Sequence, residues 1–65
     1  MKFKIMGKKG DAVYDYDVAT AEIKFNELFS AGMVPMIKES GKNQVAKVFK
    51  SDIEEITWIP QIAGG

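Results

Sequence analysis

The fold is decided by residues 17–32, which read DVATAEIKFNELFSAG. The apolar residues of this segment recur at spacings of three and four, which form one stripe along an α-helix: Val18, Ala21, Phe25, Leu28 and Phe29. Asp17 is a suitable N-cap because its carboxylate can accept hydrogen bonds from free amides of the first turn. Gly32 can adopt the left-handed conformation that ends a helix. The segment therefore predicts one amphipathic helix whose apolar stripe belongs to the core, with Ile23 pointing away from it.

The residues before this helix predict a β-hairpin. Residues 2–6 alternate polar and apolar side chains, and residues 12–16 alternate again, which is the pattern of half-buried strands. The two glycines within residues 7–11 suit the turn between these strands. In the second strand, Tyr14 and Tyr16 share one face.

The residues after the helix predict three further strands. Residues 33–38 form an apolar run, which Pro35 restricts to a sheet edge or to a strand start. Residues 45–49 alternate after a turn at residues 40–43, and the last strand is expected at residues 55–62.

Together these elements predict an α+β fold with the order β-β-α-β-β-β, in which one helix covers one face of a mixed sheet within a single domain, residues 1–65. The first and last strands are expected side by side at the centre, so that the C-terminal residues leave from a rigid strand. The other face is expected to be partly bare and to carry some of Tyr14, Tyr16, Trp58 and the methionines. Such a patch indicates either partner binding or the close packing of a small core.

The composition argues against an enzyme. The chain has 65 residues with no histidine and no cysteine, so no side chain with an ordinary pKa near neutrality and no thiol nucleophile is present. A domain of this size also lacks room for a large enclosed active site. We expect no metal site and no cofactor. All nine cationic residues are lysines and balance nine acidic ones, so no overall field favours nucleic acid.

The hydropathy pattern predicts a cytoplasmic protein. No apolar stretch approaches the ~20 residues that cross a membrane, and the first residues alternate instead of forming a signal peptide. We therefore expect no membrane partner. We also expect a monomer.

The last residues carry the sharpest functional signal. Residues 59–65 read IPQIAGG, and glycine lets such a tail adopt almost any backbone conformation and enter a narrow channel. This ending and the order of elements resemble the ubiquitin-like β-grasp sulfur carriers, most closely the small diglycine-ended carriers of thiamine and molybdopterin biosynthesis. The element pattern covers the whole chain, whereas the specific motif covers only these last residues.

The resemblance implies a carrier that acts through the carboxylate of Gly65, with Gly64 beside it in a flexible tail. An ATP-dependent adenylating enzyme of the ubiquitin-activating (E1-like) type would activate this carboxylate. A sulfur donor or acceptor enzyme would then give a thiocarboxylate, or a lysine amine would give an isopeptide. Ala63 is small enough to follow the glycines into the partner's channel, while Ile62 and Ile59 would anchor the end of the strand.

Two other functions remain open. A weaker resemblance to diglycine-ended β-grasp proteins of phages and mobile elements implies a noncovalent structural or regulatory module. Such a module would bind through the exposed sheet face, with Trp58, Tyr14 and Tyr16 as aromatic anchors. A nucleic-acid binder would instead combine these tyrosines with the lysines of the first hairpin, which are Lys2, Lys4, Lys8 and Lys9. Net neutrality and the absence of arginine place this function last.

Overall fold

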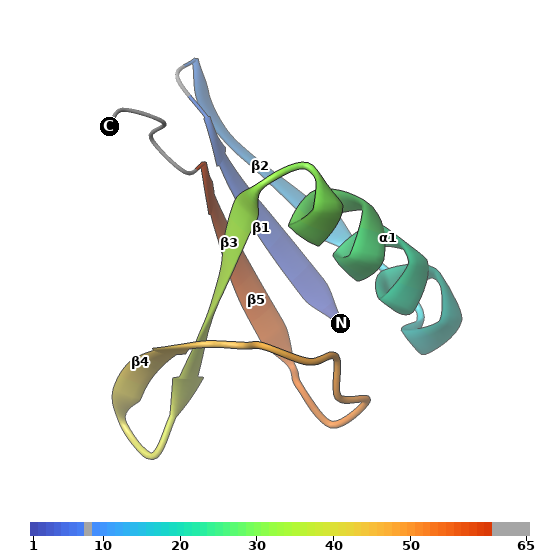
Figure 1. Cartoon of the computed structure of the whole chain (residues 1–65), viewed down its shortest axis with the longest axis vertical. Helices are drawn as coiled ribbons and strands as arrows, with labels where there is room; N and C mark the ends of the chain where they lie inside the picture. Colours follow the sequence, from blue (N-terminus) through green and yellow to red (C-terminus); the bar gives the residue numbers. More distant parts are fainter. Residues whose placement is uncertain (8, 61–65) are drawn as a thin grey trace.

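The computed structural model describes residues 1–7 and 9–60. Within these residues the elements are β1 Lys2–Gly7, β2 Gly10–Asp15, α1 Val18–Ser30, β3 Met33–Glu39, β4 Lys42–Val45 and β5 Glu55–Pro60. The strands form one mixed sheet of five strands in the order β2-β1-β5-β3-β4, with α1 on one side of it (Figure 1). The predicted order of elements and the α+β class with one helix and a mixed sheet are confirmed.

The centre of the sheet is formed by the first and last strands, as the sequence predicts. β1 and β5 run parallel, with Phe3 opposite Ile56 and Ile5 opposite Trp58. On its other side β5 pairs antiparallel with β3, and this pairing continues to Pro60. The end of β5 is therefore held in the sheet by a neighbouring strand.

The helix begins and ends where its cap residues predict. Asp17 is the N-cap, and Gly32 follows the helix with a φ of 90°. Of the predicted stripe, Ala21 and Phe25 are buried in the core. The members in the first and last turns, Val18 and Phe29, are each 47% exposed, so the stripe is buried only in its middle. Ile23 points away from the core, as predicted, and is 59% exposed.

The core lies between α1 and the sheet and is mainly aromatic. Trp58 and Phe3 are fully buried, with ring centroids 5.7 Å apart. From the helix, the Phe25 ring meets Trp58 nearly edge-on at 5.3 Å. Ile56, Ala21 and Ala46 complete the buried cluster. Apolar burial of this kind is the main term that stabilises so small a domain.

The predicted fourth strand, residues 45–49, is wrong. The observed strand β4 is Lys42–Val45, and it follows a turn in which Ser40 and Gly41 both have positive φ, at 54° and 79°. Two such residues match the twist of a tight hairpin, so pairing with β3 starts at Lys42. Beyond β4 the chain leaves the sheet, and Phe49 turns inward to contact Phe25 at 5.6 Å between ring centroids.

Strand β3 lies inside the sheet, between β5 and β4, so of the two places expected for Pro35 the sheet edge is wrong, and Pro35 is the third residue from the start of its strand. Its residue partner on β5 is Trp58, and its carbonyl accepts a hydrogen bond of 2.9 Å from the N–H of Ala46. In an extended residue the nitrogen points to the same side as the carbonyl. The proline nitrogen therefore faces β4. The β3 residues paired with β4 are Met36 to Glu39, so Pro35 lies just outside this pairing and no ladder hydrogen bond is lost.

Candidate functional site

The residues predicted to carry chemistry follow β5 directly. Gly65, Gly64, Ala63 and Ile62 belong to residues 61–65, which lie outside the described residues. Ile59 is the penultimate residue of β5 and is 39% exposed. The described part of the chain thus fixes the point at which this segment starts.

The second feature is the sheet face opposite α1, which we call the open face. Side chains alternate between the two faces of a strand, and paired residues on neighbouring strands point the same way. Phe3 and Trp58 are buried under α1, so Lys4 and Ile59, each one residue further along its strand, belong to the open face. Within the described residues, no element covers this face (Figure 1).

Strand pairing arranges the open face in three rows that run across the strands. The row at the end of β5 is apolar except for its outermost residue and contains Asp11, Met6, Ile59 and Val34. The middle row contains Val13, Lys4, Thr57, Met36 and Val45. The third row, which we call the charged row, contains Asp15, Lys2 and Glu55. Lys38 and its partner Asn43 lie at the same level on β3 and β4, past the last pair between β3 and β5.

The charged row alternates in sign across the sheet. Lys2 stands opposite Asp15 on one side and opposite Glu55 on the other. Lys38 and Glu55 line one hollow of about 460 Å³ at the end of the sheet where β3 and β5 cease to pair. Opposite charges on neighbouring strands stabilise a sheet by a few tenths of a kcal/mol per pair, up to about 1 kcal/mol. The row therefore reads minus, plus, minus on β2, β1 and β5, and Lys38 adds a positive charge on β3 across that hollow.

The predicted aromatic anchors do not lie on the open face. Trp58 is fully buried, and its indole N–H has no hydrogen-bond partner among the described residues. Tyr14 is paired with Phe3 and therefore points to the side of α1. Tyr16 follows β2 and meets the Phe3 ring edge-on at 5.2 Å. Of the residues of which some were expected on the bare face, these three rings are therefore not on it, because the register of the hairpin places the tyrosines on the core side.

Of the three rings, Tyr14 stays a candidate for partner binding. Its side chain is 45% exposed at the rim of the helix-covered face and stacks on Tyr16, with centroids 5.8 Å apart. The methionine part of the expectation is confirmed, since Met6 and Met36 lie in rows of the open face and Met6 is 38% exposed.

The lysines of β1 have acidic residues beside them on the sheet. The Lys4 amine lies 3.8 Å from a carboxylate oxygen of Asp11. Lys2 stands between two acidic residues of the charged row, as described above. This arrangement gives phosphate groups no basic stripe on β1, although phosphate neutralisation is the main source of affinity for nucleic acid.

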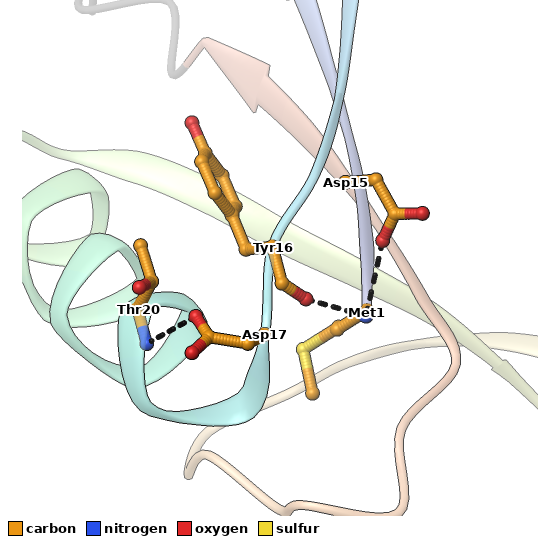
Figure 2. A network of polar contacts seen from close by, with 5 residues as sticks. All are labelled: Met1, Asp15, Tyr16, Asp17 and Thr20. Atoms are coloured by element: carbon orange, nitrogen blue, oxygen red, sulfur yellow. Dashed lines mark hydrogen bonds and ion pairs between the residues drawn. The ribbon is translucent and has the colours of Figure 1, made fainter.

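A small polar network joins the hairpin to the helix (Figure 2). The Met1 amine donates to the Tyr16 carbonyl at 2.7 Å and lies 3.4 Å from the Asp15 carboxylate. The next residue, Asp17, accepts a hydrogen bond of 3.1 Å from the Thr20 backbone N–H. Hydrogen bonds donated by Thr20 lower the pKa of the Asp17 carboxyl below its usual value of 3.8. The bond from the Thr20 side chain has the larger effect, and the bond from its backbone N–H comes second. These contacts fix the start of α1 and leave no free acid or base for catalysis at this point.

The described residues contain no group of three or more histidine, cysteine or acidic side chains placed to hold a metal ion. A second hollow of about 560 Å³ lies between the first residue of the chain and residues 51–55, and its lining is mostly polar or acidic. No helix among the described residues is long and apolar enough to cross a membrane.

The sequence interpretation missed the apolar residues of the open face other than Ile59 and the methionines. These are Val13, Val34 and Val45. The sequence contains a signal for Val13, because it alternates with the tyrosines and must face away from them. This alternation predicts that Val13 lies on the open face only once the tyrosines are known to face the core.

Comparisons of the chain with protein families, with curated proteins and with solved structures found no match. Any functional assignment therefore has to come from the residues and their arrangement.

Proposed function

We propose that this protein is a ubiquitin-like β-grasp carrier that acts through the carboxylate of Gly65, as a sulfur carrier or as a protein modifier. One observation carries the proposal: the residues ending in Gly64-Gly65 follow β5, which lies between β1 and β3 at the centre of the sheet. A tail that starts from a central strand is presented in a defined direction. The sheet order, with its single parallel pair between the first and last strands, supports the β-grasp assignment.

The chemistry belongs to a partner enzyme and requires a free carboxylate on Gly65. A carboxylate oxygen attacks the α-phosphorus of ATP, and pyrophosphate leaves, which gives an acyl adenylate. Hydrosulfide then displaces AMP to give a thiocarboxylate with release of one proton. Alternatively, a lysine amine displaces AMP to give an isopeptide, again with release of one proton. The carrier itself contributes recognition and positioning of the reacting group.

Recognition is supported by the row of the open face that lies at the end of β5. Met6, Ile59 and Val34 form its apolar part, and Met6 and Ile59 are each more than a third exposed. A partner that holds this row has the start of the tail beside it. Apolar side chains exposed together on a small protein are typical of a protein-binding surface.

The test is the intact mass of the protein after incubation with cell extract, ATP, magnesium and cysteine as the sulfur donor. We expect a gain of about 16 Da, the difference between sulfur and oxygen, or adducts of higher mass for a modifier. Deletion of Gly65 should abolish either product without unfolding the domain. Ile59→Lys should reduce the yield while leaving the fold intact, because it changes an exposed side chain.

A noncovalent binding module is the second candidate, and the exposed apolar residues of the open face favour it. Such a module works without activation of Gly65. An unchanged mass in an extract that modifies a known carrier would contradict the first proposal and support this one.

A further inference from the structure

We infer that the open face binds the open face of a second copy of this protein, around a two-fold axis that runs parallel to the strands between β1 and β5. This inference uses only described residues and does not depend on the carrier function. It departs from the expectation of a monomer. The argument starts from the order of charges in the charged row.

A two-fold axis parallel to the strands places each row of one copy over the same row of the second copy. The residues of the second copy then follow in the reverse order across the strands. The charged row, with Lys38 beyond its end, reads minus, plus, minus, plus and then faces a row that reads plus, minus, plus, minus. Lys2 meets Glu55 of the second copy, and Asp15 meets Lys38 of the second copy. Each contact occurs twice because a two-fold interface is isologous. The charged row with Lys38 is therefore complementary to itself.

The same axis matches most of the other two rows. The exception lies at the edge, where Asp11, paired with Lys4 of its own chain, meets Val34 of the second copy. Met6 meets Ile59 of the second copy, and Val13 meets Met36 of the second copy, so exposed apolar side chains cover one another. Lys4 meets Thr57 of the second copy, and its charge is already paired with Asp11 at 3.8 Å. Apolar contact in the centre with satisfied polar groups around it is the usual composition of an interface.

The alternative axis, perpendicular to the strands in the plane of the face, fails on the same residues. It would place the charged row over the apolar row, with Lys2 on Met6 and Glu55 on Ile59. It would also bring Asp15 against Asp11 of the second copy, which is a like-charge contact. Burial of an unpaired charge against an apolar side chain is strongly unfavourable. The residue pattern thus selects one of the two axes.

The size of the face predicts a weak dimer. About this axis the four strands β2, β1, β5 and β3 overlap; spaced about 4.8 Å apart, each with about six residues that rise about 3.3 Å, they give roughly 350–400 Å² per copy. Stable complexes bury roughly 800 Å² per partner, so this interface belongs with weak, transient contacts. Packed sheets also rotate by about 30°, so the pairs nearest the axis, Lys2 with Glu55 and Met6 with Ile59, stay closest. Because the dimer covers Ile59, a partner that docks there competes with the second copy.

The test is sedimentation equilibrium of the full chain at low salt, from low micromolar to millimolar concentration. We expect the average mass to rise above 7.2 kDa toward twice that value as concentration increases. Lys2→Glu and Glu55→Lys should each weaken association at least tenfold, because like charges then oppose one another twice. Controls with the same charge changes on exposed residues away from the open face, Lys47→Glu and Glu22→Lys, should leave it unchanged.

The decisive sample is an equal mixture of the Lys2→Glu and Glu55→Lys proteins. In a mixed dimer the two reversed charges face each other, and the two native charges face each other, so association should return to near the level of the unchanged protein. Inside each variant chain the neighbouring like charges remain, so an effect within one chain predicts no recovery. Amide chemical shifts measured on dilution of the unchanged protein should move at open-face residues. A constant monomer mass, no recovery in the mixture, or shifts confined to α1 would overturn the inference.

Discussion

The Asp17 carboxylate accepts a hydrogen bond of 3.1 Å from the backbone N–H of Thr20, three residues further along the chain. Asp17 itself has extended backbone angles, with φ −70° and ψ 167°, as an N-cap should. The residue before it, Tyr16, still exchanges hydrogen bonds with Met1 at the end of the hairpin. Two residues, Tyr16 and Asp17, thus separate β2 from α1 (Figure 2), and the side chain of Asp17 caps the start of the helix.

Loss of this cap should lower the melting temperature. Asp17→Ala leaves the first-turn amide of Thr20 without its side-chain acceptor, and lost caps of this kind destabilise proteins measurably. Asp17→Asn keeps an acceptor oxygen and is the matched control, which should melt close to the unchanged protein. Thermal unfolding followed by circular dichroism compares the three chains. Equal melting of all three would show that the hydrogen bond contributes nothing to stability.

The same carboxylate predicts a pH dependence with a definite sign. Hydrogen bonding from the Thr20 side chain, and then from its backbone, lowers the pKa of Asp17 in the folded state below 3.8. A lowered pKa means that the contribution is complete above the unfolded value and disappears as the pH falls through the folded value. The stability advantage of Asp17 over Asp17→Ala should therefore be constant near neutral pH and shrink in acid. An advantage that grows on acidification would contradict the assignment.

The features that the sequence predicts correctly are local. The cap at Asp17, the helix and the end at Gly32 depend on residues within a few positions of one another. The failures depend on distant contacts. Residues 45–49 alternate like a strand, but the contact between Phe49 and Phe25 takes the chain out of the sheet after Val45. The register of the hairpin is such a distant contact, because it is set by pairing across the turn. A shift of this pairing by one residue would move every side chain of the strand to the other face of the sheet.

In the candidate site, too, local features can be predicted from the sequence and features that depend on distant contacts cannot. Ile59 could be predicted as exposed near the end of the last strand, because its neighbours in sequence define its alternation. The charged row could not be predicted, since it joins Asp15, Lys2 and Glu55 from three strands. Its pattern exists only once the order of the strands is known.

Gly32 should resist replacement by alanine. Its φ of 90° lies in a region where a Cβ atom clashes with the backbone, and the N–H of Gly32 donates to the Phe29 carbonyl at 3.1 Å. Gly32→Ala should cost about 1–2 kcal/mol in the free energy of unfolding. Gly32→Asn is the control, because asparagine tolerates left-handed angles better than alanine, and it should cost less. Urea unfolding measures both, and a neutral Gly32→Ala would contradict the conformation.

The two tyrosines should differ in their contribution to stability. Both take part in one stack, with centroids 5.8 Å apart, but Tyr16 also meets Phe3 edge-on at 5.2 Å. Tyr14→Ala should cost no more than about 1.5 kcal/mol, the value of an aromatic pair. Tyr16→Ala should cost at least about 1 kcal/mol more, because a half-buried ring leaves the core as well. Urea unfolding of the two variants side by side provides the comparison, and equal costs would mean that the Phe3 contact is not stabilising.

Trp58 combines complete burial with an indole N–H that has no partner among the described residues. Trp58→Ala removes most of the aromatic core and should cost about 3–5 kcal/mol. A chain of 65 residues has a total stability of roughly 3–10 kcal/mol, so this variant should be largely unfolded or close to it.

Trp58→Phe separates the two properties of this side chain. It leaves a void of roughly 40 Å³, which costs about 1 kcal/mol at about 24 cal/mol per Å³. It also removes a buried donor whose unmet hydrogen bond costs about 1–3 kcal/mol. The two effects oppose each other, so the free energy of unfolding in urea should be unchanged or higher by up to about 2 kcal/mol. A loss of about 2 kcal/mol would mean that the N–H has an acceptor in the folded protein, since the void alone costs about 1 kcal/mol.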